Sequence, residues 1–197
     1  MNPKKIMILC GSPRPKGNTH TLADWAAEGA KSCGAEVEKV DVTRLRYASH
    51  GCTSCYGCQK LKEYRCVLKD EASELLARIP GFDALVIATP VYFFGPSAQI
   101  KVLLDRGYSL FKFNLETGAV STALKGTAIA VIASAGADVS QGLKAVEDTY
   151  RALASFTGGS FSSLLVPEAP HEVGGLARDS AMREKALAFG RKLASSL

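Results

Sequence analysis

The chain has 197 residues, of which 47% are hydrophobic and 22% are charged. These values are ordinary for a globular protein, and the length suits one domain with a sizeable core. The longest nearly apolar run, residues 84–94, is too short to cross a bilayer, and residues 6–10 are too few for the core of a signal peptide. We therefore expect a single domain over residues 1–197, without a membrane segment and located in the cytoplasm.

The formal net charge of +5 is distributed unevenly along the chain. Residues 1–69 carry 12 Lys and Arg against 6 Asp and Glu, whereas residues 70–197 carry 12 against 13. An excess of positive charge in the first third suits an anionic ligand there. The basic residues are too scattered, and too rarely interleaved with aromatic residues, for a nucleic-acid surface. No nucleic-acid partner is therefore expected.

Hydrophobic patterning predicts strands that alternate with helices. Short apolar or alternating runs predict five strands, at residues 6–10, 36–42, 84–89, 127–133 and 161–166. Apolar residues spaced three and four apart predict helices between the strands and after the last one. This alternation predicts an α/β fold of three layers, with a doubly wound, five-stranded parallel sheet in the order 2-1-3-4-5.

A few residues mark the expected ends of these elements. Asn18 or Thr19 is the expected N-cap of the first helix, and Asp70 caps the second. Pro90 is expected to stop the third strand, and Gly95-Pro96 to open the helix that follows it.

Residues 107–125 have no clear period. They include Tyr108, Phe111 and Phe113, which are too apolar for an ordinary exposed loop. Clustered apolar side chains of this kind predict a buried contact between subunits, in a homodimer or a homotetramer.

In a doubly wound sheet, ligands bind beyond the carboxyl ends of the strands, where the strand order reverses. Three loops are expected at that edge, namely residues 11–17, 90–96 and 134–140. All three are rich in Gly, Pro or Ser, and none is a minimal connector. We therefore expect the ligand to lie among them.

The first loop has the composition of a phosphate site. It leads into a helix, whose first N–H groups and dipole attract an anion. Polar side chains and basic side chains accompany this helix start, and the candidate residues are Ser12, Arg14, Lys16, Gly17, Asn18 and Thr19. The sequence does not match a Walker loop, a dinucleotide fingerprint or a tyrosine-phosphatase loop. A Gly- and Pro-rich turn without a ligand is the alternative.

Three separated segments form a set in the expected order. The first is Gly11-Ser12-Pro13-Arg14 through Gly17-Asn18-Thr19, the second is residues 89–98 with Lys101 and Asp105-Arg106, and the third is Ser134-Ala135-Gly136. This set resembles the flavodoxin-like, NADPH-dependent FMN reductase family, and the similarity extends from residue 5 to about residue 166.

The resemblance implies a flavodoxin-like fold and bound FMN. It implies that the phosphate is held by Ser12, Arg14, Asn18 and Thr19. It also implies that the isoalloxazine ring is lined by Pro90, Val91, Tyr92 and Phe93, with Ser134, Ala135 and Gly136 on its other side. The chemistry agrees, because a flat amphipathic ring needs polar groups at its edge and apolar walls at its face. Core packing is the alternative for Tyr92.

Four of the six cysteines lie in a cysteine-rich segment, residues 47–66. They follow the pattern Cys-x2-Cys-x2-Cys-x7-Cys, formed by Cys52, Cys55, Cys58 and Cys66. In a cytosolic chain such a group indicates metal or redox chemistry rather than structural disulfides. The spacing suits an iron–sulfur cubane better than zinc. Cys10 and Cys33 lie outside it and are interpreted as small buried hydrophobic residues.

The cysteine spacing is similar to the cluster motif of the iron–sulfur flavoproteins, a branch of the same family. Lys69-Asp70-Glu71 downstream also resembles that motif, whereas the long basic spacer, residues 59–65, departs from it. The resemblance implies that the four cysteines hold a [4Fe–4S] cluster that exchanges electrons with FMN. Zinc, a disulfide and bare thiols are the alternatives.

The resulting prediction is an FMN-dependent oxidoreductase. Electrons pass from NAD(P)H, or from a reduced protein such as ferredoxin, to FMN and onward directly or through the cluster. The flavin supplies the reactive atom, so no side chain is assigned as a catalytic acid or base. The alternatives are a cluster-free NAD(P)H-dependent FMN or quinone reductase, a non-catalytic flavodoxin-like electron carrier, and a zinc-stabilised binding module without flavin.

Overall fold

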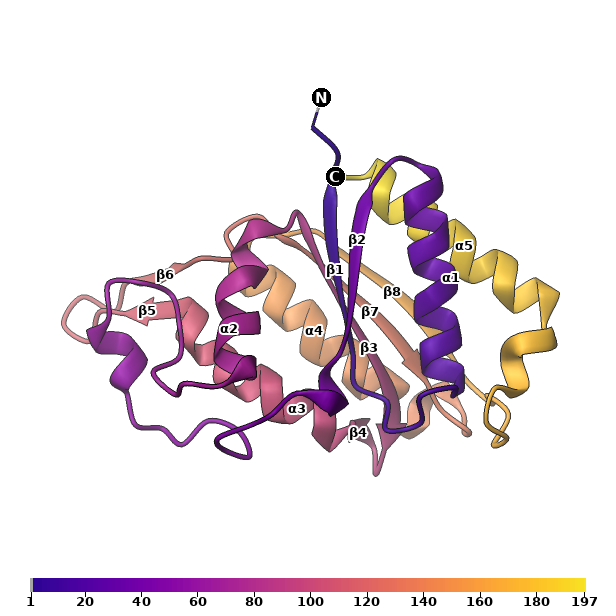
Figure 1. Cartoon of the computed structure of the whole chain (residues 1–197), viewed down its shortest axis with the longest axis horizontal. Coiled ribbons are helices and arrows are strands. Elements are labelled where there is room, and N and C mark those ends of the chain that lie inside the picture. The colour runs from indigo at the N-terminus through magenta and orange to yellow at the C-terminus, as the bar shows by residue number, and fades with distance from the viewer. Residues whose placement is uncertain (1) are drawn as a thin grey trace.

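The computed structural model describes residues 2–197 and contains a central parallel sheet (Figure 1). The sheet is built from β1 (Lys5–Cys10), β2 (Glu36–Asp41), β3 (Ala84–Tyr92), β7 (Ala128–Ser134) and β8 (Phe161–Val166). The strand order is β2-β1-β3-β7-β8, which confirms the predicted order 2-1-3-4-5. The order reverses between β1 and β3, so the carboxyl ends of these two strands border the predicted ligand edge.

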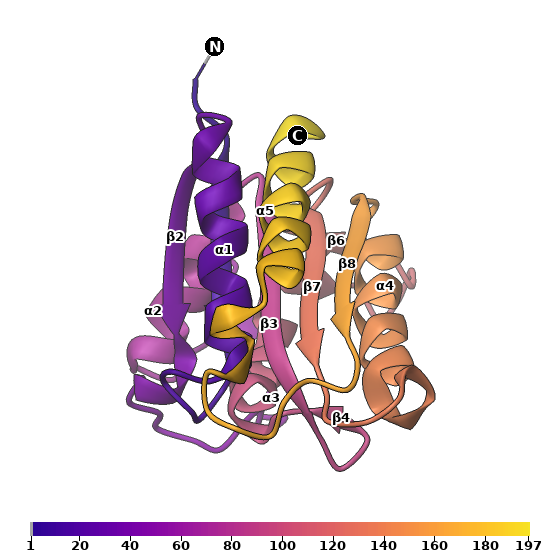
Figure 2. The same cartoon turned by 90° about the vertical axis from the view of Figure 1, so that its right-hand side faces the viewer.

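Helices cover both faces of the sheet and make the three layers (Figure 2). One face is covered by α1 (Asn18–Ser32) and α5 (Ser180–Ser195). The other is covered by α2 (Glu71–Arg78), α3 (Ala98–Asp105) and α4 (Lys144–Thr157). Because successive side chains on a strand point to opposite faces, the apolar run of β1 serves both layers. Ile6 and Ile8 pack with α1 and α5, whereas Met7 and Leu9 pack with the other three helices.

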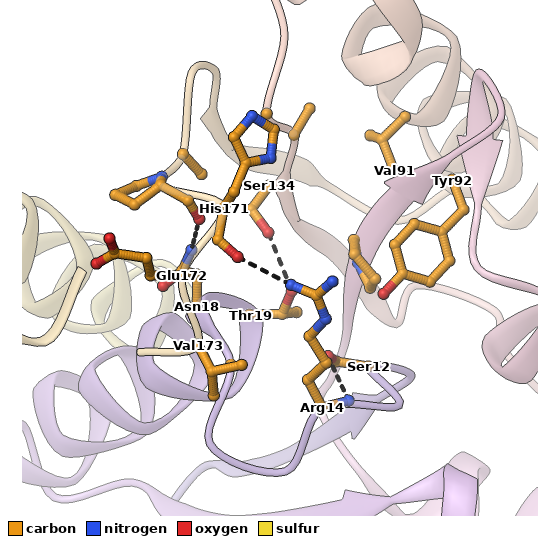
Figure 3. A pocket seen from close by; sticks show the side chains of 16 residues that line it. Ser12, Arg14, Asn18, Thr19, Val91, Tyr92, Ser134, His171, Glu172 and Val173 are labelled. Carbon is orange, nitrogen blue, oxygen red and sulfur yellow. Dashed lines mark hydrogen bonds between the residues drawn. The ribbon is translucent and has the colours of Figure 1, made fainter. Parts of the chain in front are cut away.

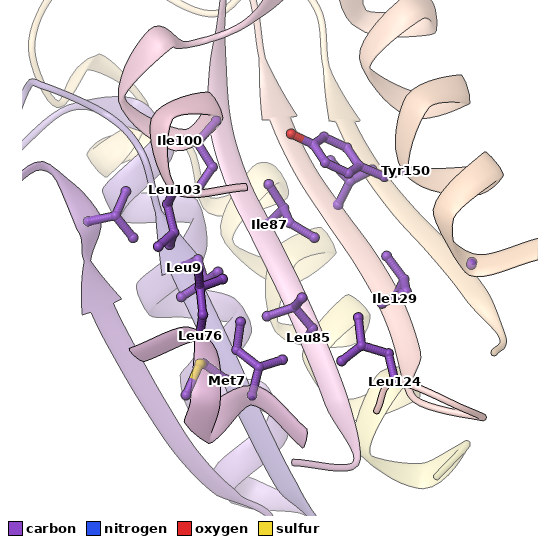
Figure 4. Packing of buried hydrophobic residues seen from close by; sticks show 14 of the residues in the cluster. Met7, Leu9, Leu76, Leu85, Ile87, Ile100, Leu103, Leu124, Ile129 and Tyr150 are labelled. Atoms are coloured by element: carbon purple, nitrogen blue, oxygen red, sulfur yellow. The ribbon is translucent and has the colours of Figure 1, made fainter. Parts of the chain in front are cut away.

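Figure 4 shows the core on the second face, where strand residues meet side chains from the helices. The strands contribute Met7, Leu9, Leu85, Ile87 and Ile129, and the helices contribute Leu76, Ile100, Leu103 and Tyr150. All of these side chains are at most 4% exposed. A strand buried on both faces is apolar throughout, which is why β3 and β7 read as continuous hydrophobic runs.

The path of β3 corrects two expectations. Pro90 does not stop the strand, which continues to Tyr92 and pairs Pro90 with Ser134 of β7. The carbonyl of Ala88 accepts from the Gly11 N–H, so Pro90, two residues later, faces the same side beyond the end of β1. No ladder donor is required there, and a proline is therefore tolerated.

Gly95-Pro96 does not open a helix. It forms the short strand β4 (Gly95–Pro96), which returns antiparallel to the end of β3. Helix α3 begins at Ala98, two residues after Pro96, because Ser97 is its N-cap and the Ser97 hydroxyl accepts from the Ile100 N–H.

The N-cap of α1 is also corrected. It is Gly17, with extended backbone, rather than Asn18 or Thr19. The Asn18 side chain is used elsewhere, because its amide donates to the Pro170 carbonyl over 2.7 Å and its oxygen accepts from the Leu176 N–H over 3.1 Å. Asp70, in contrast, caps α2 as expected.

The aromatic residues of the segment 107–125 pack within the chain. Tyr108 and Phe113 stack with ring centroids 5.0 Å apart, and Phe111 meets Phe156 of α4 at 5.5 Å. The segment forms a hairpin of β5 (Phe111–Phe113) and β6 (Val120–Thr122). Its apolar content is therefore explained largely by intramolecular contacts, which removes the basis on which it predicted a subunit contact.

Cys10 is fully buried, as predicted, and burial raises the pKa of its thiol to about 11. Cys33 is exposed, which contradicts its interpretation as a buried residue. It follows the last turn of α1, where the chain leaves the helix towards β2. Across residues 2–197, no helix has both the length and the apolar character needed to cross a membrane.

Candidate functional site

A cavity of about 250 Å³ opens at the carboxyl ends of β1, β3 and β7 (Figure 3). Eleven of the thirteen predicted FMN-binding residues line it, namely Ser12, Arg14, Gly17, Asn18, Thr19, Pro90, Val91, Tyr92, Ser134, Ala135 and Gly136. The three loops that the sequence singled out therefore meet around one space. A doubly wound sheet places them there because their strands are neighbours.

The start of α1 points its free N–H groups towards this cavity. The first N–H groups of a helix have no partner within the helix. Here the N-cap is Gly17, and no side chain of residues 2–197 caps the helix end. The first turn also lacks an acidic residue that would compete for the positive end of the helix dipole. This helix start is therefore available for an anion.

Hydroxyl groups flank the helix start. Thr19 and Ser134 are both buried, and their hydroxyl oxygens lie 3.0 Å apart, which joins the first loop to the end of β7. The Ser12 hydroxyl accepts from the Arg14 N–H over 3.3 Å. These groups place several short polar side chains beside the uncapped N–H groups, as a phosphate site requires.

The chain after β8 closes one side of the cavity, which the sequence did not predict. Residues 169–173 all line it. The Arg14 guanidinium donates to the His171 carbonyl over 3.1 Å, and Figure 3 shows this bond spanning the cavity wall. A Cβ at Gly136 would lie 2.6 Å from the His171 ring, so the third loop needs glycine for this close approach. The only signal in the sequence was the position of this segment directly after the fifth strand.

Two predicted residues lie outside the cavity. Lys16 is exposed and does not line it. Phe93 stands at the tip of the β3–β4 turn and is 98% exposed. It adopts a left-handed backbone conformation with φ of 46°, as does Phe94 with φ of 66°, which is costly for bulky residues.

The four cysteines of the cysteine-rich segment surround a second, smaller cavity of about 20 Å³. Cys52, Cys55, Cys58 and Cys66 all line it. The segment turns tightly between them, because Ser54 and Tyr56 both have left-handed backbone. The Gly57 N–H, and after it the Thr53 hydroxyl, hold the pKa of the Cys55 thiol below its usual value.

The thiols are near one another without forming a ligand set at metal distance. Among residues 2–197, no three His, Cys, Asp or Glu side chains are arranged to hold a metal ion, and all six cysteines are free. The chemistry of the donors nevertheless fits a thiolate-ligated group, because four cysteines share one cavity that contains no carboxylate or imidazole.

The β5–β6 hairpin holds the cysteine-rich segment in place. The Lys112 ammonium donates to the carbonyls of Cys58, Leu61 and Glu63. The Gln59 amide pairs with the β5 backbone, donating to the Phe111 carbonyl over 2.9 Å and accepting from the Phe113 N–H over 3.1 Å. Hydrogen bonds between side chains and backbone groups therefore hold the spacer between the third and fourth cysteines, although its sequence departs from the family pattern.

A buried ion pair closes the base of the cysteine cavity. Arg106 directs both Nη1 and Nη2 at the Asp70 carboxylate, over 2.6 and 2.7 Å, and the two side chains are 0% and 6% exposed. Asp70 also accepts from the N–H groups of Ala48 and Ser73. Hydrogen bonding to Arg106, helped by these two N–H groups, lowers the pKa of Asp70 to about 2.

Helix α3 connects the two cavities. At its start, the Ser97 hydroxyl donates to the Gly11 carbonyl over 2.6 Å, and a Cβ at Gly11 would lie 2.5 Å from that of Ile100. At its end, Arg106 lines the cysteine cavity. Helix α3, which is roughly 12 Å long for its eight residues, therefore joins the first loop to the cysteine cavity.

A doubly wound sheet with an uncapped helix start at its switch point is the architecture of flavodoxin-like proteins. Residues 4–167 match the family described as NADPH-dependent FMN reductase. The match spans most of the chain, and this protein therefore belongs to that family.

Relatives narrow the position of the chain within the family. An iron–sulfur flavoprotein of Methanocaldococcus jannaschii is 36% identical over 107 residues, which are 54% of this chain and 53% of the relative. A second one from the same organism is 31% identical over 163 residues, covering 82% and 79%. The chain thus groups with the iron–sulfur flavoproteins, although it spans only about half the length of the first relatives that it matches.

Solved structures agree with the fold. The NAD(P)H:quinone oxidoreductase of Methanothermobacter marburgensis superimposes with a TM-score of 0.71 at 19% identity and covers 98% of both chains. At this identity the likeness shows a shared flavodoxin-like fold.

The Asp70–Arg106 pair predicts an acid-dependent loss of stability. The pKa of Asp70 is about 2 in the folded chain against an ordinary 3.8, so the unfolded chain binds more protons between these values. Stability therefore falls as the pH drops through this range, by about 2 kcal/mol at 1.36 kcal/mol per pKa unit.

Denaturant unfolding of the wild type and of Asp70→Asn checks this. Between about pH 4 and pH 2, we expect the wild type to lose about 2 kcal/mol more than the variant, which carries no such carboxylate. Parallel losses in the two proteins would show that Arg106 does not keep Asp70 ionised.

Proposed function

We propose that this protein is an FMN-dependent oxidoreductase that takes electrons from NAD(P)H, or from a reduced carrier such as ferredoxin. The observation that carries the proposal is the uncapped start of α1, which faces a cavity at the switch point of the sheet. Family membership supports FMN as the anionic ligand. Bound FMN supplies the chemistry by accepting and donating electrons, and the chain supplies the binding and orientation.

Each part of the cavity has a role in holding FMN. The phosphate lies at the start of α1, where Ser12 and Thr19 offer hydroxyl groups and Arg14 offers charge. The ring lies between Pro90, Val91 and Tyr92 on one side and Ser134, Ala135 and Gly136 on the other. Tyr92 is 41% exposed, so its ring is free to cover one face of a flat ligand.

We further propose that Cys52, Cys55, Cys58 and Cys66 hold a [4Fe–4S] cluster. The four thiols share one cavity, and relatives with up to 36% identity are named iron–sulfur flavoproteins. Such a cluster supplies one-electron chemistry, which lets a two-electron donor serve a one-electron acceptor. Both cavities lie at loops that follow the carboxyl ends of neighbouring strands, because the first loop follows β1 and the cysteine-rich segment follows β2.

A cluster-free NAD(P)H-dependent FMN or quinone reductase is the second candidate. The observation in its favour is that the thiols of residues 2–197 do not meet at metal distance. Under this reading the cysteines remain thiols or hold zinc, and electrons leave FMN directly.

We also propose that the protein forms a homodimer or a homotetramer. Phe93 and Phe94 are 98% and 63% exposed, lie 5.7 Å apart by ring centroids, and keep their costly left-handed backbone beside the FMN cavity. An exposed apolar tip held in a strained conformation is stabilised when a second subunit covers it.

The first test concerns the phosphate. Arg14→Gln removes a charge at the cavity wall, and Lys16→Gln removes the same charge from the same loop outside the cavity. A hydrogen bond to a charged group contributes about 1.5–3 kcal/mol, so we expect Arg14→Gln to weaken FMN binding by roughly tenfold or more. Lys16→Gln should change it by less than about threefold.

Riboflavin, which lacks the phosphate, is the matched ligand. Fluorescence titration should show that Arg14→Gln leaves riboflavin affinity unchanged while FMN affinity falls. Equal losses for both flavins, or equal losses in both variants, would contradict the placement of the phosphate. Chromatography of the flavin released by heat should identify FMN, and recovery of FAD would contradict the proposal.

The second test concerns the cluster. Cys58→Ala removes one of the four proposed ligands, and the anaerobically purified variant should lose iron, acid-labile sulfide and the broad visible absorption of the cluster. FMN should stay bound, because the FMN cavity shares no lining residue with the cysteine cavity. Cys33→Ala is the control and should lose neither, because Cys33 is exposed and distant from the group in sequence. Wild-type protein that contains no iron would favour the cluster-free reductase.

The third test concerns assembly. Light scattering should report a dimer or a tetramer for the wild type and a shift towards monomer for Phe93→Ser/Phe94→Ser. Leu115→Ser is the control, because Leu115 is 93% exposed on the β5–β6 hairpin, away from the FMN cavity. A monomeric wild type at micromolar concentrations would refute the assembly.

A further inference from the structure

Arg106 is a fully buried cation at the cysteine cavity. Its side chain is 0% exposed, although an arginine is always charged and is rarely buried without a partner. Asp70 is that partner, and it takes both Nη atoms of the guanidinium. Arg106 lines the cavity together with the four cysteines, whereas Asp70 does not. The positive charge is therefore nearer to the cavity than the negative one.

One guanidinium nitrogen of Arg106 has no acceptor. Within residues 2–197, its Nε has no hydrogen-bond partner, although the atom is buried. Nη1 and Nη2 both bind Asp70, so Nε is the guanidinium nitrogen that is left without a partner beside the cavity. Cys66 lines the same cavity as Arg106, and after Asp70 it helps to raise the pKa of the guanidinium. A buried donor without an acceptor is unfavourable, so an acceptor at this place would satisfy it.

We propose that Arg106 is a positioning and potential-setting residue for the cluster, to which its Nε–H donates a hydrogen bond at the Cys66 corner. This inference rests on the proposed function, because it requires the four cysteines to hold a [4Fe–4S] cluster. As a cluster ligand, Cys66 is a thiolate with negative charge. Its sulfur accepts a hydrogen bond from the buried Nε–H of Arg106, which otherwise has no acceptor.

The charge of Arg106 favours the reduced cluster. Reduction adds one electron, and hence one negative charge, to a group that four thiolates already make negative. No bond breaks and no proton is required. A cation held beside the cluster in a buried place stabilises the added charge more strongly than it would in water. Hydrogen bonds to the sulfurs act in the same direction.

The experiment measures the reduction potential of the cluster in purified holoprotein. Iron and sulfide contents are determined first, and the potential is then titrated with redox mediators and followed by the electron paramagnetic resonance of the reduced cluster. Arg106→Gln should make reduction at least tenfold less favourable, which moves the potential about 59 mV to the negative for one electron. Arg106→Lys keeps the charge and loses the Nε donor, so its potential should lie between those of the wild type and of Arg106→Gln.

Two further variants separate the electrostatic role from a structural one. Asp70→Asn removes the countercharge and leaves Arg106 in place, so reduction should become more favourable than in the wild type. A role of Arg106 only in supporting Asp70 would instead give Asp70→Asn and Arg106→Gln the same effect. Arg46→Gln is the control for net charge, because Arg46 pairs with Glu71 beside Asp70 but is 87% exposed and lies outside the cavity. Arg46→Gln should change the equilibrium constant for reduction of the cluster by less than about twofold.

Removal of one partner from a buried ion pair destabilises the fold, and Arg106→Gln alone can fail to accumulate. The double variant Asp70→Asn/Arg106→Gln places two neutral amides opposite each other. It contains no unpaired buried charge, so the reduction potential is measured in this variant as well. Its potential should lie below that of the wild type, because the lost cation is nearer to the cavity than the lost anion.

The outcomes separate the presence of the cluster from the role of Arg106. Wild-type protein without iron and sulfide overturns the cluster, and this inference with it. A cluster whose potential is the same in the wild type, in Arg106→Lys and in the double variant overturns only the role of Arg106. A positive shift in the double variant, or a negative shift in Asp70→Asn, would also overturn it.

Discussion

The ion pair between Asp70 and Arg106 holds together the half of the molecule that carries the cysteines. Asp70 caps α2, Arg106 follows the last residue of α3, and the Ala48 N–H binds Asp70 where the cysteine-rich segment begins. The Ser73 hydroxyl donates to the Cys66 carbonyl near the end of that segment. Asp70 and Ser73, at the start of α2, thus hold the two ends of a segment that has little regular structure. Breaking a buried ion pair costs about 3–5 kcal/mol, because the remaining charge is left buried.

Helix α3 extends this constraint to the FMN cavity. Ser97 caps the helix and binds Gly11 of the first loop, and close packing of Gly11 on Ile100 leaves no space for a side chain there. The helix therefore links the first loop at one end to the cysteine cavity at the other. The first loop and the base of the cysteine cavity are thus positioned by a helix rather than by flexible loops alone.

Most of the fold could be predicted from the sequence, because its signals are local. Strand β8 lies at the predicted residues, and the five-strand order follows from the alternation of apolar runs with helical periods. The loop that lines the larger cavity could be located because a helix start next to short polar residues is a contiguous pattern. The position of Asp70 as a cap was also predictable, since capping depends only on neighbouring residues.

Tertiary structure decided the features that depend on residues distant in sequence. The contact of His171 with Gly136 and Arg14 arises because the chain after β8 returns to the strand edge, which no local pattern encodes. The pairing of Arg106 with Asp70 joins residues 36 positions apart, and the sequence alone gave no reason to separate it from surface ion pairs. Hydrophobic periodicity and capping act between near neighbours along the chain, so the sequence determined the layers and their order. Burial and the partners of charged groups are settled only when the layers pack together.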